Sequence, residues 1–233
     1  MMDSVSYSAR RSEIQTYFDR TAAEAWKRFA SDAPLGRIRE SVREGRARMR
    51  ERMLDCLPAD LTGWRILDAG CGTGAVSVAL ARRGATVVGV DLAPEIIRFA
   101  EDTLPEDLRR DGRIELHAGD MLAERLGTFD AVIAMDSLIH YGGDDAVAAL
   151  KRLAERSLDR IVFTFAPGTP ALLAMHRIGQ FFPRSNRSPA IVPIRPTDIA
   201  GRLDEALGGW RVASSERVTH GFYTSQMMEL VRR

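Results

Sequence analysis

The stretch ILDAGCGTGAVSVAL, residues 66–80, decides the fold. An apolar strand-like run leads into a turn with three glycines, and an apolar helical pattern follows it. Gly70, Gly72 and Ala75 satisfy the pattern G-x-G-x-x-G/A, in which the glycines allow a tight turn and let a ligand approach the backbone. We therefore predict a strand, a ligand-binding loop and a helix, the opening unit of a nucleotide-binding α/β fold.

From Trp64 onward, short apolar runs alternate with helical patterns. We expect strands at 65–69, 86–91, 113–117, 129–135 and 160–166, and helices at 75–83, 94–104, 144–157 and 197–207. This alternation predicts a parallel sheet with helices on both faces, because right-handed crossovers place the helices there. Two further strand-like runs, 210–218 and 222–231, indicate an antiparallel hairpin at the edge of a mostly parallel, seven-stranded sheet.

Two parts of the chain fall outside this alternation. Amphipathic helical patterns occupy residues 14–29 and 35–57. Residues 167–195 contain a short apolar helical pattern between prolines and interrupt the strand–helix rhythm. We expect residues 1–60 to form a helical lid and residues 61–233 to form the main domain, with the insertion at 167–195 capping the substrate site.

Composition limits the classes of partner. The 233 residues have a formal net charge of +1, and no basic region is interleaved with aromatic residues, so we expect no nucleic-acid partner. Cys56 and Cys71 have no metal-ligand spacing, and we expect no resident metal. The N-terminus lacks the apolar core of a signal peptide, and no apolar run approaches the ~20 residues that span a bilayer. We expect a cytoplasmic protein with at most peripheral membrane association.

Asp68, two residues before the first glycine, distinguishes between two nucleotides. A dinucleotide would bring two negative phosphates to the loop and to the start of the helix, where this carboxylate would repel them. S-adenosylmethionine instead carries a cationic ammonium and a cationic sulfonium. At ~4 Å in a partly buried site, one such attraction amounts to roughly 4 kcal/mol before desolvation. Asp68 therefore favours S-adenosylmethionine over NAD.

Two more acidic residues follow neighbouring strands. Asp91 ends the second strand, where either kind of fold would place an acid on ribose hydroxyls. Asp120, in HAGDM, is placed to accept a hydrogen bond from an adenine amino group. Taken singly these acids also fit ordinary turns, but together they favour an adenosine ligand. The residues expected to bind the cofactor are Asp68, Gly70, Cys71, Gly72, Gly74, Asp91, Leu92, Gly119, Asp120, Met121, Met135 and Asp136.

Four motifs carry a resemblance to a known superfamily. LDAGCGTG (67–74), VVGVD (87–91), GDM (119–121) and FDAVIAMDSLIHY (129–141) resemble the motifs of class I S-adenosylmethionine-dependent methyltransferases. The resemblance implies a Rossmann-like fold and this cofactor, and it is nearly silent on the substrate. The tetrad N/D-P-P-Y/F, typical of enzymes that methylate amino groups of nucleic-acid bases, does not follow the fourth strand.

A narrower resemblance runs over nearly the whole chain. The segments that carry it are YFDRTAAEAWKRF (17–29), IRESVREGRARMR (38–50), SLIHY (137–141), FTFAPGTP (163–170), FPRSNRSPAIVPI (182–194) and GFYTSQMMELVRR (221–233). Together they resemble the magnesium-protoporphyrin IX methyltransferase family. This implies methyl transfer to one propionate of the porphyrin, a step towards (bacterio)chlorophyll. It also implies delivery of the porphyrin by a subunit of magnesium chelatase and loose association with photosynthetic membranes.

A flat macrocycle with anionic propionates needs an apolar slot and cations. For these roles we expect Met175, Ile178 and Phe182, and the arginines Arg39, Arg43, Arg184 and Arg187. The alternative for the apolar residues is packing of the insertion onto the sheet. A solvated helix face is the alternative for the arginines, and we prefer it for most arginines within 46–52.

The catalytic candidate is His140, which follows the fourth strand and matches the active-site histidine of the family's LIHY motif. It either orients the carboxylate or removes a residual proton. Some relatives carry a tyrosine shortly after the tryptophan of the N-terminal segment, where this chain has Phe29 and Ala30. Tyr17 is the candidate replacement, either in catalysis or in cofactor contact.

Three other functions stay open from the sequence. One is methylation of another small carboxylic acid or hydroxyl compound. A second is a cofactor-bound interaction subunit that performs no catalysis and presents the arginine-rich helix to a partner. The third is an NAD-dependent oxidoreductase.

Overall fold

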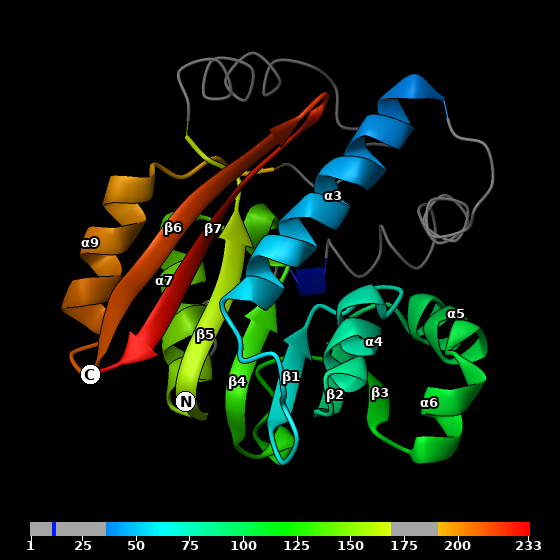
Figure 1. The fold of residues 1–233 in the computed structure, drawn as a ribbon. Helices are drawn as coiled ribbons and strands as arrows, with labels where there is room; N and C mark the ends of the chain where they lie inside the picture. The colour runs from blue at the N-terminus through cyan, green and yellow to red at the C-terminus, as the bar shows by residue number, and fades with distance from the viewer. Residues whose placement is uncertain (1–10, 13–35, 169–190) are drawn as a thin grey trace.

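The computed structural model describes residues 11–12, 36–168 and 191–233. The first N-terminal helical pattern, with Tyr17, and most of the insertion lie outside these residues. The strands are β1 (Arg65–Ala69), β2 (Thr86–Asp91), β3 (Ile114–Ala118), β4 (Phe129–Ala134), β5 (Ser157–Phe165), β6 (Trp210–His220) and β7 (Tyr223–Arg232). They form one seven-stranded sheet in the order β3-β2-β1-β4-β5-β7-β6 (Figure 1).

The helices connect these strands as the alternation predicts. They are α3 (Arg37–Asp55), α4 (Ala75–Arg82), α5 (Pro94–Thr103), α6 (Glu106–Asp111), α7 (Gly143–Ala154) and α9 (Pro196–Ala206). Two short 3-10 helices, η2 (Glu124–Leu126) and η3 (Leu138–His140), follow β3 and β4. None of the helices in the described ranges is long and apolar enough to cross a membrane.

Strand pairing confirms the predicted mixed sheet. Strands β1 to β5 pair in parallel, and β7 pairs antiparallel with both β5 and β6, so the last two strands form the expected edge hairpin. Strand order reverses at β1, which pairs with β2 on one side and β4 on the other. Ligands bind beyond the carboxyl ends of the strands at such a switch point. Asp68 lies opposite Gly89 of β2 and Ile133 of β4, in the middle of the sheet near that end.

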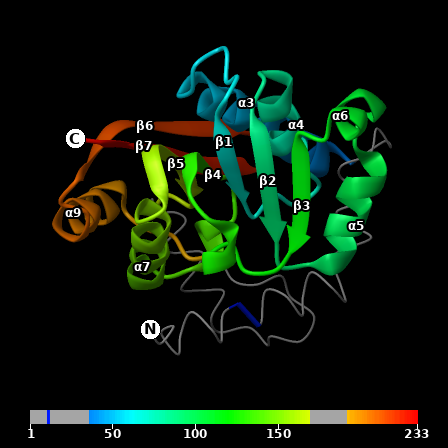
Figure 2. The same cartoon turned by 90° about the horizontal axis from the view of Figure 1, so that it is seen from below.

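Helices cover both faces of the sheet (Figure 2). On one face α3, α4 and α6 pack an apolar cluster that includes Met49, Leu80 and Leu108. On the other face α7 and α9 pack a second cluster that includes Leu150 and Leu203. Helix α5 contacts β2 and β3, at the edge of the sheet that β3 forms.

Helix α3 belongs to the core through one of its faces. Met49 and Met53, one turn apart, are 0% and 1% exposed. Gly45 lets the helix approach the hairpin, because a Cβ there would come within 2.6 Å of the Cβ of Tyr223. The division of the chain at residue 60 and the lid stay predictions, but this half of α3 is packed against the sheet.

Most element boundaries lie within a few residues of the predicted ones. Pro94 begins α5 and Gly84, with φ of +99°, follows the end of α4. Helix α6 was not expected, because six residues, EDLRRD, are too few to show periodicity. Strand β5 begins at Ser157 rather than at residue 160, and α7 ends correspondingly earlier.

Candidate active site

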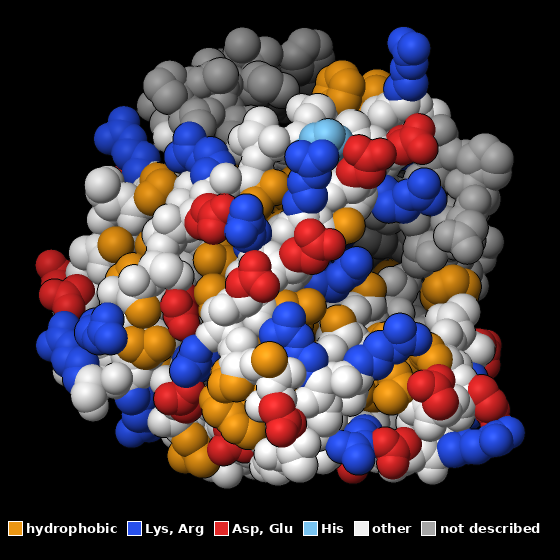
Figure 3. All heavy atoms as spheres, in the orientation of Figure 1, with side chains coloured by type: hydrophobic (Ala, Val, Ile, Leu, Met, Phe, Trp, Pro, Cys, Tyr) orange, Lys and Arg blue, Asp and Glu red, His pale blue; other side chains and the backbone are white. Residues whose placement is uncertain are grey.

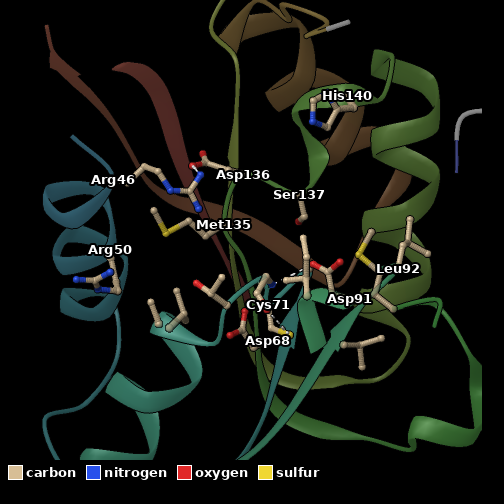
Figure 4. Close-up of a pocket in the computed structure, with 18 of the residues that line it drawn as sticks. Arg46, Arg50, Asp68, Cys71, Asp91, Leu92, Met135, Asp136, Ser137 and His140 are labelled. Carbon is tan, nitrogen blue, oxygen red and sulfur yellow. Dashed lines mark hydrogen bonds and ion pairs between the residues drawn. The ribbon is translucent and has the colours of Figure 1, made fainter. Parts of the chain in front are cut away.

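A cavity of about 350 Å³ opens at the carboxyl ends of β1 to β4, bordered on one side by α3. Apart from Gly74, all residues expected to bind the cofactor line it, as do His140 and Arg43 (Figure 4). Gly74 instead caps the start of α4 with φ of +81°. Residues from separate motifs are therefore brought into one site.

The glycine loop is shaped by positive φ angles and by a close contact. Gly70 and Gly72 have φ of +82° and +53°, which side chains other than glycine rarely adopt. A Cβ on Gly70 would come within 2.3 Å of the Cβ of Ser137, which follows β4. At Gly72 no atom of the described residues lies within 4 Å of the place of a Cβ, so this side of the loop is open to the cavity.

Asp68 lies under the loop and is only 1% exposed. Its Oδ2 accepts a hydrogen bond of 2.6 Å from the Oγ of Ser77 in α4. Burial raises the pKa of Asp68 to about 7, and its hydrogen bond to Ser77 opposes this rise. A cation in the cavity would favour the charged carboxylate. The carboxylate of Asp68 is more buried than we expected for a group that faces the cofactor. Its contact with the methyl donor stays a prediction.

Asp91 and Asp120 shape the opposite wall. Asp91 accepts hydrogen bonds from the backbone N–H groups of Gly72 at 3.0 Å and Ala93 at 3.1 Å, which ties the glycine loop to the end of β2. Asp120 accepts from Leu122 N at 2.9 Å and from Arg11 Nη1 at 2.5 Å. A carboxylate offers about four acceptor positions, so both can still accept from ribose or adenine.

Asp136, two residues after the end of β4, joins α3 to β5 and β7. Its Oδ2 accepts 2.6 Å from Arg46 Nη1, and its Oδ1 accepts 3.1 Å from both Thr164 Oγ1 and the hydroxyl of Tyr223. Burial, followed by the negative charge of Asp136, raises the pKa of Tyr223. Asp136 also has φ of +52°, a strained angle for a side-chain-bearing residue, of the kind that clusters at functional sites.

His140 lies at the other end of the cavity from Asp68 (Figure 4). It belongs to η3 and is 7% exposed. Beside it, Val192 N donates a hydrogen bond to Ile139 O at 2.8 Å, so the chain returning from the insertion contacts η3. The Oγ of Ser137 is buried and has no hydrogen-bond partner among the described residues. A ligand would supply one.

The arginines of α3 that line the cavity are not the ones that the sequence predicted. Arg43, Arg46 and Arg50 line the cavity. Arg39 and Arg48 are exposed and do not. The preference for a solvated face was thus wrong for Arg46 and Arg50, because a helical pattern does not show which polar face meets a cavity. Arg46 follows Arg43 by three residues and Arg50 follows Arg46 by four, and this spacing was a usable signal, since it puts all three arginines on one helix face.

The remaining candidates, Tyr17, Met175, Ile178, Phe182, Arg184 and Arg187, lie outside the described residues. Within the described ranges, no group of three histidine, cysteine or acidic side chains could hold a metal ion. Basic and acidic side chains are interspersed over the face that carries α3 and the hairpin, without a broad patch of one sign (Figure 3).

The cavity fits a nucleoside with a cationic tail. Asp68 is the penultimate residue of β1, Asp91 ends β2 and Asp120 follows β3, and the loop after β1 leaves an open cradle at Gly72. A pyrophosphate would meet Asp68 and Asp91 at this loop, whereas an ammonium and a sulfonium would be attracted there.

Comparisons with known proteins agree with the geometry. A family model described as a methyltransferase domain matches residues 66–158, and one described as the magnesium-protoporphyrin IX methyltransferase C-terminus matches residues 134–232. The chain is 46% identical to magnesium-protoporphyrin O-methyltransferase of Rhodobacter capsulatus, over 96% of this chain and 97% of the relative. It is 30% identical to the Synechocystis enzyme of the same name, over 94% and 95%.

A crystal structure of magnesium protoporphyrin IX methyltransferase from Synechocystis PCC 6803 with bound SAH superposes with a TM-score of 0.83. The identity is 29%, and the match covers 96% of this chain and 100% of that one. Another structure of the Synechocystis protein, with bound SAM, gives a TM-score of 0.81 at 26% identity, covering 96% and 97%.

Fold and site together define a class I S-adenosylmethionine-dependent methyltransferase. Within that class, the chain belongs to the magnesium-protoporphyrin O-methyltransferase family, because the similarity extends over almost the full length of this chain and of its relatives.

Proposed function

We propose that this protein transfers the methyl group of S-adenosylmethionine to one propionate carboxylate of magnesium-protoporphyrin IX and so forms the monomethyl ester. The observation that carries the proposal is 46% identity over 96% of the chain to a relative named for this porphyrin. The seven-stranded fold and the acid-lined cavity support the choice of methyl donor.

The reaction needs little acid–base chemistry. A propionate with a pKa near ~4.5, like that of glutamate, is already ionised at pH 7. S-adenosylmethionine supplies an electrophilic methyl group, so that a carboxylate oxygen–carbon bond forms while the carbon–sulfur bond breaks and its electron pair stays on sulfur. No proton has to leave, and the protein mainly holds the reacting atoms in line, which can supply ~7–11 kcal/mol.

The two ends of the cavity suit two tasks. Asp91, Asp120 and the glycine loop hold the nucleoside. His140, at the other end, orients the attacking carboxylate, or acts as general base if the apolar slot raises the pKa of the propionate. Of the arginines expected to bind the propionates, Arg43 is the described one that lines the cavity, and it lies in the N-terminal half of α3. We assign propionate binding to it.

The test combines a product analysis with a variant. Purified protein is incubated with S-adenosylmethionine and magnesium-protoporphyrin, and in parallel with other small carboxylic acids, and products are identified by mass spectrometry. We expect a porphyrin monomethyl ester and no product from the other acids. Products from other acids with none from the porphyrin would reassign the substrate.

The variant His140→Asn tests the catalytic role of His140. We expect kcat to fall by up to about 10²-fold if His140 only orients the carboxylate, and by about 10²–10⁴-fold if it acts as general base. Affinity for S-adenosylhomocysteine should be unchanged, because Asp68 and the glycine loop lie at the other end of the cavity. Loss of both activity and this affinity would instead mean that His140 supports the cofactor site.

Family membership also supports proposals about the setting. We infer a cytoplasmic protein that receives its porphyrin from the porphyrin-binding subunit of magnesium chelatase and associates peripherally with photosynthetic membranes. Co-sedimentation with vesicles of such membranes, with and without that subunit, tests both statements. Protein that stays in the supernatant would contradict the membrane association. Protein that elutes separately from the chelatase subunit in gel filtration would contradict the delivery of the porphyrin by that subunit.

A further inference from the structure

Ser137 carries a buried polar group that the fold itself does not use. Its Oγ forms no hydrogen bond within the described part of the chain. Ser137 is the N-cap residue of η3, a position in which a serine hydroxyl usually accepts a hydrogen bond from a backbone N–H group, but its side chain does not cap this helix. Buried hydroxyls are almost always hydrogen-bonded, and one without a partner destabilises the folded state. The hydroxyl of Ser137 therefore needs a partner from outside the chain.

The position of Ser137 links the two ends of the cavity. Ser137 lines the cavity, and a Cβ on Gly70 would come within 2.3 Å of its Cβ and 3.2 Å of its Oγ, so its side chain lies directly against the glycine loop. His140 follows three residues later, at the end of η3. Figure 4 shows Ser137 between His140 on one side and Cys71 and Asp91 on the other. The hydroxyl is thus placed where the methyl donor and the methyl acceptor have to meet.

The chemistry of a hydroxyl selects the group that it binds. A serine hydroxyl donates one hydrogen bond and needs an acceptor for it. Asp91 and Asp136, which line the same cavity, accept hydrogen bonds from other groups and none from Ser137. The sulfonium of the methyl donor is cationic and is no acceptor. The propionate, which has to approach this sulfonium, is the anionic acceptor that the reaction brings to this place, and hydrogen bonds to ionised groups are the strong ones.

We infer that Ser137 is a further substrate-binding residue, an assignment that rests on the proposed methylation of a propionate. Its Oγ–H donates to the carboxylate oxygen that does not attack, which becomes the carbonyl oxygen of the ester. The other oxygen keeps its lone pairs for the methyl carbon. Because the first oxygen accepts hydrogen bonds both before and after the transfer, the bond persists and no proton moves. Together with His140, Ser137 fixes the direction of attack.

The inference predicts opposite changes in stability and in activity. Ser137→Ala removes a hydroxyl that has no partner in the ligand-free protein, so we expect its Tm without ligands to rise by about 2–4 °C. Its kcat/KM for magnesium-protoporphyrin should fall by about 10- to 100-fold, the range for a hydrogen bond to a charged group. Its affinity for S-adenosylhomocysteine should stay unchanged. Loss of a merely structural residue would not raise the Tm while lowering the activity.

Ser157→Ala is the matched control. Ser157 is also buried, but its Oγ donates a hydrogen bond of 2.8 Å to the carbonyl oxygen of Arg160, and it does not line the cavity. Loss of this bonded hydroxyl should lower the Tm and leave kcat/KM unchanged. Ser137→Cys keeps a side chain of similar shape with a weaker donor, so its kcat/KM should lie between those of Ser137→Ala and the wild type. Scanning calorimetry, steady-state kinetics of ester formation and titration calorimetry with S-adenosylhomocysteine measure these quantities.

Four results would overturn the inference. A Tm of Ser137→Ala at or below that of the wild type would show that the hydroxyl already has a partner without a ligand. An unchanged kcat/KM would exclude the bond to the propionate, and weaker binding of S-adenosylhomocysteine would assign the hydroxyl to the cofactor. Wild-type protein that forms no porphyrin ester would refute the proposed function and with it this choice of acceptor. The Tm of Ser137→Ala separates that last case, because it does not depend on the substrate.

Discussion

Replacing Asp68 with asparagine tests the electrostatics under the glycine loop. In the unfolded chain this carboxyl ionises near pH 3.8, whereas burial raises its pKa in the folded protein to about 7. Between these values the folded state holds a proton that the unfolded state has lost. The free energy of unfolding therefore decreases as the pH rises through this window, and the stabilising contribution is lost above pH 7.

The structure sets the size of the effect. About three pH units, at 1.36 kcal/mol each, give an upper limit of about 4 kcal/mol over the whole window. About two of these units lie between pH 5 and pH 8, which corresponds to about 3 kcal/mol. Asparagine has no proton to lose. Its amide oxygen keeps the hydrogen bond from Ser77, but its buried NH₂ group costs about 1–3 kcal/mol at every pH.

We therefore expect Asp68→Asn to be less stable than the wild type at pH 5 and equally stable or more stable at pH 8. Urea unfolding at pH 5, 6, 7 and 8 without cofactor, followed by circular dichroism, measures the difference. Asp102→Asn removes an exposed acid of α5 and is the control variant, measured at the same pH values. A stability difference for Asp68→Asn that is constant from pH 5 to pH 8 would refute the reasoning.

The carboxyl of Asp68 should also make ligand binding depend on pH. Stability decreases as the pH rises towards 7, whereas affinity for the cationic cofactor should increase. A cationic ligand favours the charged form of Asp68, so binding of S-adenosylmethionine should release a proton below pH 7 and strengthen as the pH rises to about 7. Calorimetry in two buffers with different ionisation enthalpies counts this proton. Asp68→Asn should abolish the release. Proton release that persists in the variant would assign it to another group.

Two further predictions concern the attachment of α3. In Gly45→Ala the new Cβ lies 2.6 Å from the Cβ of Tyr223, so we expect the free energy of unfolding to fall by about 1–3 kcal/mol. In the control Gly201→Ala no atom of the described residues lies within 4 Å of the new Cβ, and the free energy of unfolding should rise by up to about 1 kcal/mol. Thermal melts compare them, and equal shifts would contradict the close approach. Arg46→Met leaves the Asp136 carboxylate, with its side chain 6% exposed, without its cation, and should cost about 3 kcal/mol in urea unfolding. A loss below about 1 kcal/mol would show that this ion pair does not hold α3.

The fold was predictable because its signals are local. Strand and helix patterns alternate, and residues such as Pro94 and Gly84 mark element ends, so the seven strands and the final hairpin followed from the sequence. Helix α6 did not, because its one buried residue is Leu108 and a single apolar position has no period. The start of β5 was misplaced by three residues, because Leu158 is exposed and Asp159 is charged and only partly buried, so that they do not show the pattern of a core strand.

The site was predictable where the motif itself fixes the geometry. The glycine loop and the acids Asp68, Asp91 and Asp120 lie at or next to the carboxyl ends of β1, β2 and β3, so the topology brings them together. The network around Asp136 was not predictable, since its partners Arg46 and Tyr223 are 90 and 87 positions away along the chain. Its positive φ has no sequence signal either, because the residue is not a glycine.

Single-turnover transfer of a labelled methyl group tests the central claim most directly. The protein is loaded with S-adenosylmethionine labelled in the methyl group, and magnesium-protoporphyrin IX is added. We predict that one label per porphyrin appears as an ester, at a rate that His140→Asn reduces. Label that remains on the bound sulfonium, in protein shown by calorimetry to bind both ligands, would contradict the claim that this cavity delivers a methyl group to a porphyrin carboxylate.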